Sequence, residues 1–339
     1  MFRQKSILFI APDEVVFPSV FEKNLKSLGF AVYMVVPLDA KSFRYKNIGQ
    51  RLYNFWRKTV LGDKGFKRKL ILKQRKEQLL DSLNTLENMD YGLVIRPDLY
   101  PIEFIELANR KCKTFIGYQW DGLDRYPEIQ QYMPLMDRFF VFDTNDLSVG
   151  GMLPTTNFYF DYMTPSFPNN HSTVYYLGSY LEERIDILSD INAKLETLHV
   201  NKNIKIVSDR KRVVELVASK GLTPTSEVIS YEENLQNVFK SNVLIDIQNP
   251  VHKGLSFRIF EGIGYDKKVI TTNADVVNYD FYQPENFLVW DGQDVQELAK
   301  FIATPYRPLD EVIKQKYGFS NWIAYVLDKN PYTPVDLPS

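Results

Sequence analysis

The sequence is poor in residues that commonly bind metals or form covalent links. Among its 339 residues it has one cysteine, Cys112, and three histidines, His171, His199 and His252, which do not cluster. A single cysteine excludes an intramolecular disulfide and favours a reducing compartment. With so few thiol and imidazole ligands, the composition also argues against a zinc site.

Several motifs and long apolar runs are missing as well. The patterns G-x-G-x-x-G, G-x-x-x-x-G-K-[ST] and G-x-S-x-G do not occur, which argues against dehydrogenases, P-loop enzymes and nucleophile-elbow hydrolases. No run reaches about 18 apolar residues, and the N-terminal stretch Ile7–Ile10 is too short for a signal peptide. The 41 basic and 42 acidic residues give no sign of nucleic-acid binding. We therefore expect a cytoplasmic protein.

Apolar segments of strand and helix length alternate twice along the chain, which indicates an α/β fold with two Rossmann-like doubly wound domains. The expected strands of the first half are residues 6–11, 30–36, 91–95, 113–118 and 138–142. After a turn-rich stretch at 162–172, strands are expected at residues 173–177, 204–207, 228–230, 243–247, 268–272 and 287–290. The predicted domains are residues 1–165 and 172–308, followed by helices at 309–330. In such sheets, ligands bind in a cleft at the carboxyl ends of the strands.

One candidate phosphate site lies at the start of the second domain. A strand runs into Gly178-Ser179, which predicts a tight turn, and a helix follows that carries Arg184. The amide groups at a helix N-terminus favour phosphate, and an arginine donates two hydrogen bonds to it. The alternative is a plain strand–helix turn with Arg184 on a solvated face.

The segment Gly254–Thr272 is the most informative stretch of the chain. Ser256 is a suitable N-cap for a short helix, and Arg258 and Glu261 stand three residues apart on one helix face. A carboxylate at Glu261 has two oxygens for the hydroxyls of a ribose, and Arg258 suits a phosphate. A surface ion pair of little energetic value is the alternative.

This segment is similar to the donor-site helix of GT-B glycosyltransferases, and the run from Ser256 to Glu261 most resembles bacterial polysaccharide transferases related to the CgeB proteins. The resemblance covers residues 173–300 and implies a nucleotide-sugar donor, bound as a substrate with no separate cofactor. The residue eight positions before Glu261 is Lys253, so the glutamate pair of many retaining members is absent. No Asp-x-Asp occurs, which predicts chemistry without a metal.

Acidic residues after two strands of the first half are candidates for a catalytic base. Asp121 stands in the aromatic-rich stretch Gly117–Pro127, and the resemblance implies an acidic loop in this place. Asp13 follows the first strand, where inverting members of the resembling class carry a base. Both are also compatible with ordinary loops.

A basic region interleaved with aromatic and aliphatic residues spans positions 51–76. Its basic residues are Arg51, Arg57, Lys58, Lys64, Lys67, Arg68, Lys69, Lys73, Arg75 and Lys76. Such a region suits an anionic membrane surface or a phosphorylated glycolipid, and this would place the protein peripherally at the inner face of the membrane. The alternative is a solvated helix face.

Together these features predict a metal-independent glycosyltransferase that moves a sugar from a nucleotide-sugar to a surface glycan or glycolipid. Two alternatives stay open at this point. One is a non-catalytic two-lobed protein that binds a nucleotide-sugar or glycan, because a fold persists when its chemistry is lost. The other is a sugar-nucleotide epimerase of the same fold.

Overall fold

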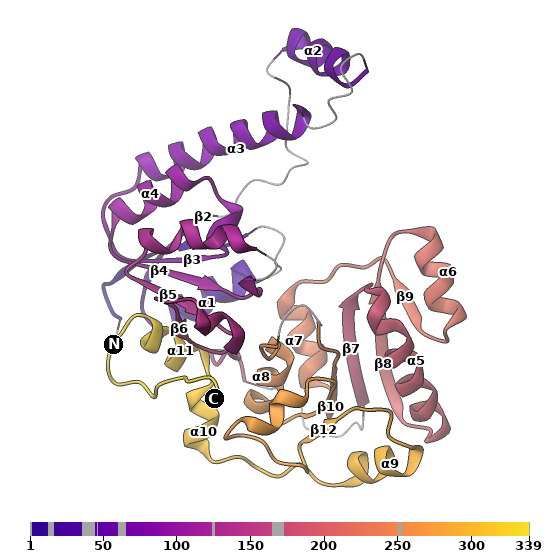
Figure 1. The fold of residues 1–339 in the computed structure, drawn as a ribbon. Helices are drawn as coiled ribbons and strands as arrows, with labels where there is room; N and C mark the ends of the chain where they lie inside the picture. Colours follow the sequence, from indigo (N-terminus) through magenta and orange to yellow (C-terminus); the bar gives the residue numbers. More distant parts are fainter. Residues whose placement is uncertain are drawn as a thin grey trace. The chain divides into compact units, whose positions relative to one another are not determined.

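The computed structural model describes residues 2–12, 17–35, 45, 47–59, 66–123, 126–164, 173–249 and 253–338. The chain forms two compact units, residues 1–140 and 141–339. The predicted α/β class with two doubly wound sheets is confirmed (Figure 1). The units divide the chain at a different place from the predicted domain limits, and those limits remain a prediction.

The first sheet has the strand order β2-β1-β3-β4-β5-β6. Its strands are β1 (Ser6–Ile10), β2 (Ala31–Val35), β3 (Met89–Ile95), β4 (Cys112–Gln119), β5 (Arg138–Val141) and β6 (Leu153–Pro154). The helices of the first unit are α1 (Pro18–Ser27), α2 (Ile48–Thr59), α3 (Phe66–Asn84) and α4 (Ile102–Lys111). Strands β1 and β3 pair in parallel and are almost wholly buried, which is why they read as continuous apolar runs.

The second sheet has the order β12-β11-β10-β7-β8-β9. Its strands are β7 (Thr173–Ser179), β8 (Asn201–Val207), β9 (Thr223–Thr225), β10 (Val243–Asp246), β11 (Lys268–Thr271) and β12 (Phe287–Val289). Its helices are α5 (Glu182–Thr197), α6 (Lys211–Ser219), α7 (Tyr231–Phe239), α8 (Phe257–Gly264) and α9 (Val295–Ala303). Helices α5 and α6 lie on one side of β7–β9, and α7 and α8 on the other (Figure 1). The strand order reverses between β7 and β10, and this reversal is where such sheets bind ligands.

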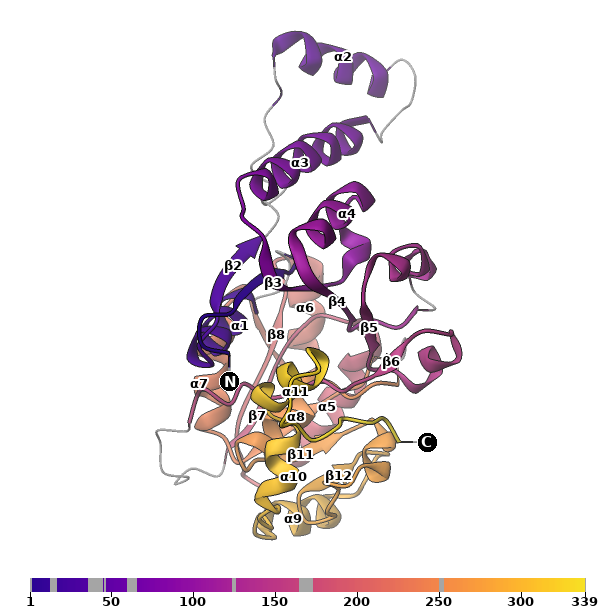
Figure 2. The same ribbon diagram turned by 90° about the vertical axis from the view of Figure 1, so that its left-hand side faces the viewer.

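Two helices end the chain, α10 (Glu311–Lys316) and α11 (Phe319–Val326). The predicted break between them falls at Gly318, the N-cap of α11. Trp322 of α11 is buried and packs on Phe158, and α10 contacts α8 (Figure 2). These contacts lie within the second unit. The predicted crossing of this segment to the N-terminal domain remains a prediction.

The cysteine is a structural residue. Cys112 begins β4, and burial raises the pKa of its thiol to about 12. The thiol is therefore protonated at neutral pH, and a nucleophilic role is unsupported because the thiolate is the reactive form. A side chain at Gly92 on the neighbouring strand would collide with Phe115 and the Cys112 sulfur.

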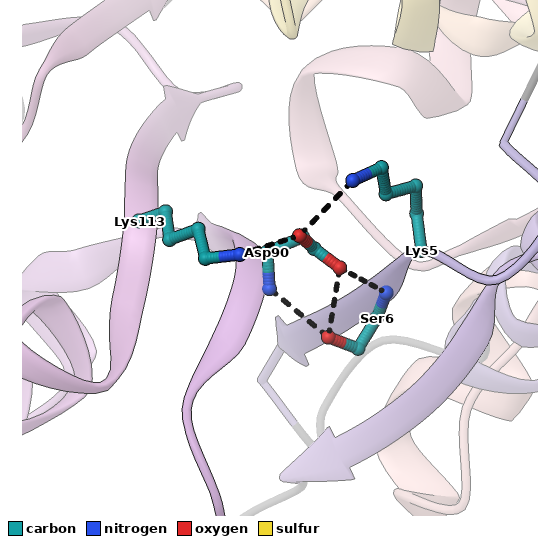
Figure 3. Close-up of polar contacts among 4 residues, drawn as sticks. All are labelled: Lys5, Ser6, Asp90 and Lys113. Carbon is teal, nitrogen blue, oxygen red and sulfur yellow. Dashed lines mark hydrogen bonds and ion pairs between the residues drawn. The ribbon is translucent and has the colours of Figure 1, made fainter.

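Asp90 connects three strands at the amino edge of the first sheet (Figure 3). Its carboxylate accepts hydrogen bonds from the Ser6 amide at 3.1 Å, from Lys113 at 3.0 Å and from Lys5 at 3.3 Å. The Ser6 amide bond is the largest cause that lowers the pKa of Asp90 to about 2, and Lys113 adds to it. This edge is opposite the one at which ligands bind, so the cluster is structural.

We predict that Asp90→Asn lowers the free energy of unfolding by about 1–2 kcal/mol at neutral pH. Because the pKa is depressed on folding, the ionised carboxylate stabilises the fold above pH 4, and this contribution disappears as the pH falls toward 2. Urea unfolding of both proteins from pH 7 to pH 2 measures the difference. A difference that stays constant over that range would contradict the account.

Candidate functional site

The guanidinium of Arg258 lies at the point where the second sheet reverses its strand order. It donates one hydrogen bond to the Ile245 carbonyl of β10 at 3.0 Å and another to the Leu177 carbonyl of β7 at 3.2 Å. Burial alone would lower the pKa of Arg258, but nearby negative groups, Glu261 foremost, raise it above its ordinary value. A permanent positive charge therefore stands at the carboxyl ends of the two central strands.

Glu261 lies on the same helix, α8, and is closed to solvent, with 2 % of its surface exposed. Its Oε1 accepts a hydrogen bond from the hydroxyl of Tyr231, the first residue of α7. Burial raises the pKa of Glu261, and this outweighs the lowering by Arg258 and by the Tyr231 hydroxyl. The carboxyl group is thus harder to ionise than an exposed glutamate.

Two buried atoms of this pair have no hydrogen-bond partner within the described part of the chain. They are Oε2 of Glu261 and Nε of Arg258. Leaving a buried polar atom unpaired costs about 1–3 kcal/mol, and native structures hold few such atoms. An acceptor and a donor on one helix therefore remain available for a ligand.

Ser256 caps α8, as predicted. Its hydroxyl accepts a hydrogen bond from the Arg258 amide at 3.2 Å and donates one to the Asp246 carboxylate at 2.6 Å. Thr271 donates to the other oxygen of Asp246 at 2.9 Å. The N-terminus of α8 is thereby fixed to the ends of β10 and β11, and this holds Arg258 in place.

The predicted turn at Gly178-Ser179 is wrong, because both residues continue β7. They pair in register with Ile206 and Val207 of β8, and α5 begins three residues later at Glu182. A side chain at Gly178 would meet the Tyr176 hydroxyl at 2.6 Å, so any larger residue there would force the Tyr176 ring to move. Arg184 lies in the first turn of α5, and its buried Nε has no partner in the described part of the chain. Phosphate binding by these three residues remains a prediction.

The loop before α8 is tied to the segment after β5. Asp143 accepts a hydrogen bond from the Lys253 amide at 2.7 Å, and Asn273 donates to the Lys253 carbonyl at 2.9 Å. Gly254 packs so closely on Phe142 that an added side chain would collide with its ring and backbone. A cavity of about 180 Å³ lies beside this loop, with Thr144 and Tyr279 in its wall.

In the first unit, Asp121 is joined to an arginine at the carboxyl edge of the sheet. Arg96, directly after β3, forms an ion pair with Asp121 and a two-bond ion pair with Asp98. Its guanidinium lies 3.9 Å from the ring centre of Tyr126, and its backbone is left-handed, with φ of 56°. Such a conformation is uncommon for a residue other than glycine and clusters at functional sites.

Asp121 keeps 22 % of its side chain exposed, whereas Asp98 is buried. Gln119, two residues earlier, is fully buried, and both polar atoms of its amide lack a hydrogen-bond partner in the described part of the chain. Asp13 lies outside the described residues. The structure thus groups Asp121 with Arg96 and Asp98. The role of Asp121 or Asp13 as a catalytic base remains a prediction.

Sequence reasoning missed Tyr231, Asp246 and Arg96. Asp246 carried a readable signal, since it ends a buried strand at the carboxyl edge of the second sheet. Tyr231 carried none, because an aromatic residue at the start of an amphipathic helix usually packs in a core. Arg96 was readable only as a charge after the strand at 91–95.

Two findings concern metals and membranes. The described residues contain no group of three or more His, Cys, Asp or Glu side chains placed to hold a metal ion. Over the same residues, no helix has the length and apolar character needed to cross a bilayer.

The architecture defines the class of fold. Two parallel sheets of six strands in one chain, each with flanking helices, match the GT-B fold of glycosyltransferases. No family model matches the sequence, and no curated protein matches it.

Solved structures identify particular neighbours. An alpha-glucosyltransferase in complex with UDP and a 13-mer DNA is similar with a TM-score of 0.56 and 11% identity, over 88% of this chain and 89% of that one. The OtsA apo structure has a TM-score of 0.55 and 10% identity, over 98% of this chain and 100% of that one. UDP-GlcNAc 2-epimerase from Neisseria meningitidis, bound to UDP-GlcNAc, has a TM-score of 0.50 and 12% identity, over 95% and 98%. Identities this low establish the fold alone.

We predict that Glu261→Gln stabilises the protein at pH 8 while weakening its binding of UDP. The raised pKa means that ionisation of Glu261 opposes folding: the neutral form stabilises the fold below pH 4, and this is lost as the pH rises through the folded-state pKa. The glutamine has no charge to bury, and each kcal/mol gained raises Tm by about 2–4 °C. Loss of the charged acceptor should weaken UDP binding about 10- to 100-fold.

Thermal unfolding from pH 4 to pH 8 and calorimetry with UDP measure the two effects. Glu215→Gln, which changes an exposed glutamate on α6, is the matched control and should alter neither. An unchanged Tm at pH 8 would show that the burial of Glu261 has no energetic cost. Unchanged UDP affinity would remove Glu261 from the donor site.

Proposed function

We propose that the protein is a glycosyltransferase that moves a sugar from a nucleotide-sugar to a bacterial surface glycan or glycolipid. It would belong with the CgeB-related polysaccharide transferases that its α8 segment resembles. The observation that carries the proposal is the Arg258 guanidinium at the carboxyl ends of β7 and β10. A GT-B fold with a fixed cation at this place suits a substrate that carries a diphosphate.

In this proposal Arg258 stabilises the charge that develops on the diphosphate leaving group. Its guanidinium is oriented before the substrate arrives, because two backbone carbonyls hold it. Preoriented charge that costs no rearrangement during the reaction is usually the largest contribution to catalysis. Arg184 and the backbone near Ser179 would share this role, and the step would need no metal.

Glu261 would accept hydrogen bonds from the ribose hydroxyls through its unpartnered Oε2. Because the side chain is 2 % exposed, the ribose can reach it only after a neighbouring group moves. The Tyr231 hydroxyl, at the start of α7, donates to the other oxygen of the carboxyl group. A shift at the start of α7 would therefore accompany donor binding.

Asp121 would take the proton from the acceptor hydroxyl, with Asp13 as the other candidate. Arg96 occupies one oxygen of the Asp121 carboxylate and fixes its direction, so Arg96 would act as a positioning residue.

An epimerase acting on the same kind of donor is the second candidate. The Neisseria meningitidis neighbour, at a TM-score of 0.50 over nearly the full length of both chains, favours it. A cation and a carboxyl group on α8 would serve an epimerase and a transferase alike, because both bind a sugar attached to a nucleoside diphosphate. A binding protein without turnover is the third.

Incubation with a panel of UDP-sugars and acceptor glycolipids, with analysis of all products, tests these functions. We predict acceptor-dependent transfer that persists in EDTA, and a loss of about 10²- to 10⁴-fold in kcat for Asp121→Asn with the affinity for UDP unchanged. A changed sugar nucleotide without acceptor would establish the epimerase. Binding with no turnover would favour the third candidate. Activity lost in EDTA and restored by Mn²⁺ would refute the metal-independent step.

We further propose that α2 brings the protein to an anionic membrane that holds the acceptor. Helix α2 contacts α3 and contains no acidic residue. Its apolar side chains Ile48, Leu52 and Phe55 are 77%, 62% and 65% exposed. An exposed amphipathic helix beside a dense basic segment suits the interface of an anionic bilayer.

Reversal of Lys67, Arg68 and Lys69 to Glu should reduce co-sedimentation with phosphatidylglycerol vesicles, more strongly at low salt. Leu52→Ser with Phe55→Ser should reduce it at all salt concentrations, since burial of apolar surface is not screened. The matched control reverses the same charge at Lys211, Arg212 and Lys220 of the second unit, and should have no effect. Equal sedimentation with neutral and anionic vesicles would leave this region as a solvated face.

A further inference from the structure

The second sheet carries a polar surface on the face that α5 and α6 do not cover. Along β8, Ile204 and Ile206 belong to the core on one face, and Asn203 and Lys205 alternate with them onto the other. Asn203 pairs in register with Tyr175, and Lys205 with Leu177 of β7. These partners share a face, so the strands present a polar stripe next to an apolar one.

A cavity of about 330 Å³ lies between this stripe and helix α7. The strands contribute Tyr175, Leu177, Asn203, Lys205 and Thr225, and the rest of the wall is Glu227, Ile229, Glu233, Gln236, Asn237 and Lys240. Pockets for small ligands begin at about 300 Å³, so the space suits one or two sugar rings.

Some residues around the cavity are held by hydrogen bonds, and others keep polar atoms that a ligand can reach. Ser230 and Glu233 close a capping box at the start of α7, and the Tyr175 hydroxyl donates to Asn234 at 2.8 Å, so helix and strand are held together. Within the described part of the chain, the half-buried side chains of Asn203 and Gln236 have no hydrogen-bond partner. Both amides are therefore free to donate and to accept.

We propose that this cavity binds a neutral saccharide unit, beside the Arg258 site, with which it shares Leu177. Amides that donate and accept at once match vicinal hydroxyls, which do the same. The two lysines balance the two glutamates of the wall, so the cavity offers no net charge to a phosphate. Leu177 and Ile229 supply an apolar patch for the face of a sugar ring. The site would hold a glycan chain near the protein, and it does not depend on the proposed donor site.

Saturation-transfer NMR and calorimetry with maltose, cellobiose, lactose and chitobiose test the proposal on the full chain. We expect at least one of the four to bind at millimolar Kd. Asn203→Leu and Gln236→Leu should each weaken that binding about three- to tenfold, in line with the loss of one or two hydrogen bonds. Asn201→Leu is the matched control, because Asn201 is exposed on the same face of β8 but outside the cavity, and it should leave the Kd unchanged.

Circular dichroism and Tm confirm that each variant is folded. Absence of binding by all four disaccharides would overturn the proposal, as would binding that neither cavity variant weakens. Displacement of the saccharide by uridine would also overturn it, because the cavity would then belong to the nucleotide. Calorimetry with UDP on the same variants separates this outcome from the proposed donor site, since UDP affinity should stay unchanged in all three.

Discussion

The second unit is organised around one cation, the guanidinium of Arg258. Arg258 donates to the carbonyl oxygens of Leu177 and Ile245, near the carboxyl ends of β7 and β10, and so occupies the place where the second sheet reverses its order. A buried guanidinium is tolerated when its N–H groups are hydrogen-bonded, and bonds to a charged group contribute about 1.5–3 kcal/mol. The same bonds that make the charge tolerable hold it in a fixed direction. Fixed charge at a ligand-binding edge is what a diphosphate leaving group requires.

Glu261 shows a conflict between stability and function around that cation. Burial raises its pKa, one carboxylate oxygen is held by Tyr231, and the other has no partner in the described part of the chain. A glutamine or an apolar residue would be easier to bury at this position. Residues that cost stability in the free protein are typical of sites that become satisfied when a ligand binds. Arg96, with its left-handed backbone and its ion pairs to two carboxylates, is a second residue of this type, because its conformation also costs stability.

The sequence predicted those features that depend on neighbours along the chain. The Ser256 cap, the shared face of Arg258 and Glu261 and most strands follow from local pattern, and the structure confirms them. The partners of Arg258 lie 13 and 81 residues away, so their contacts could not be read locally. Gly178 looked like a turn because glycine favours turns, but pairing with β8 keeps it in the strand. The strand expected at 228–230 is also wrong: β9 is Thr223–Thr225, and Val228 is 75% exposed. Tertiary pairing overrode local preference in both places.

The most direct test of the central claim locates the diphosphate without any substitution. A UDP analogue with a photoreactive group on its terminal phosphate is bound to the full chain, cross-linked by light and mapped by peptide mass spectrometry. The account predicts labels in the loop before α8 and at the start of that helix, residues 253–261, or at residues 177–184, and their loss when excess UDP competes. Labels confined to residues 1–140, or labels that UDP does not displace, would contradict it.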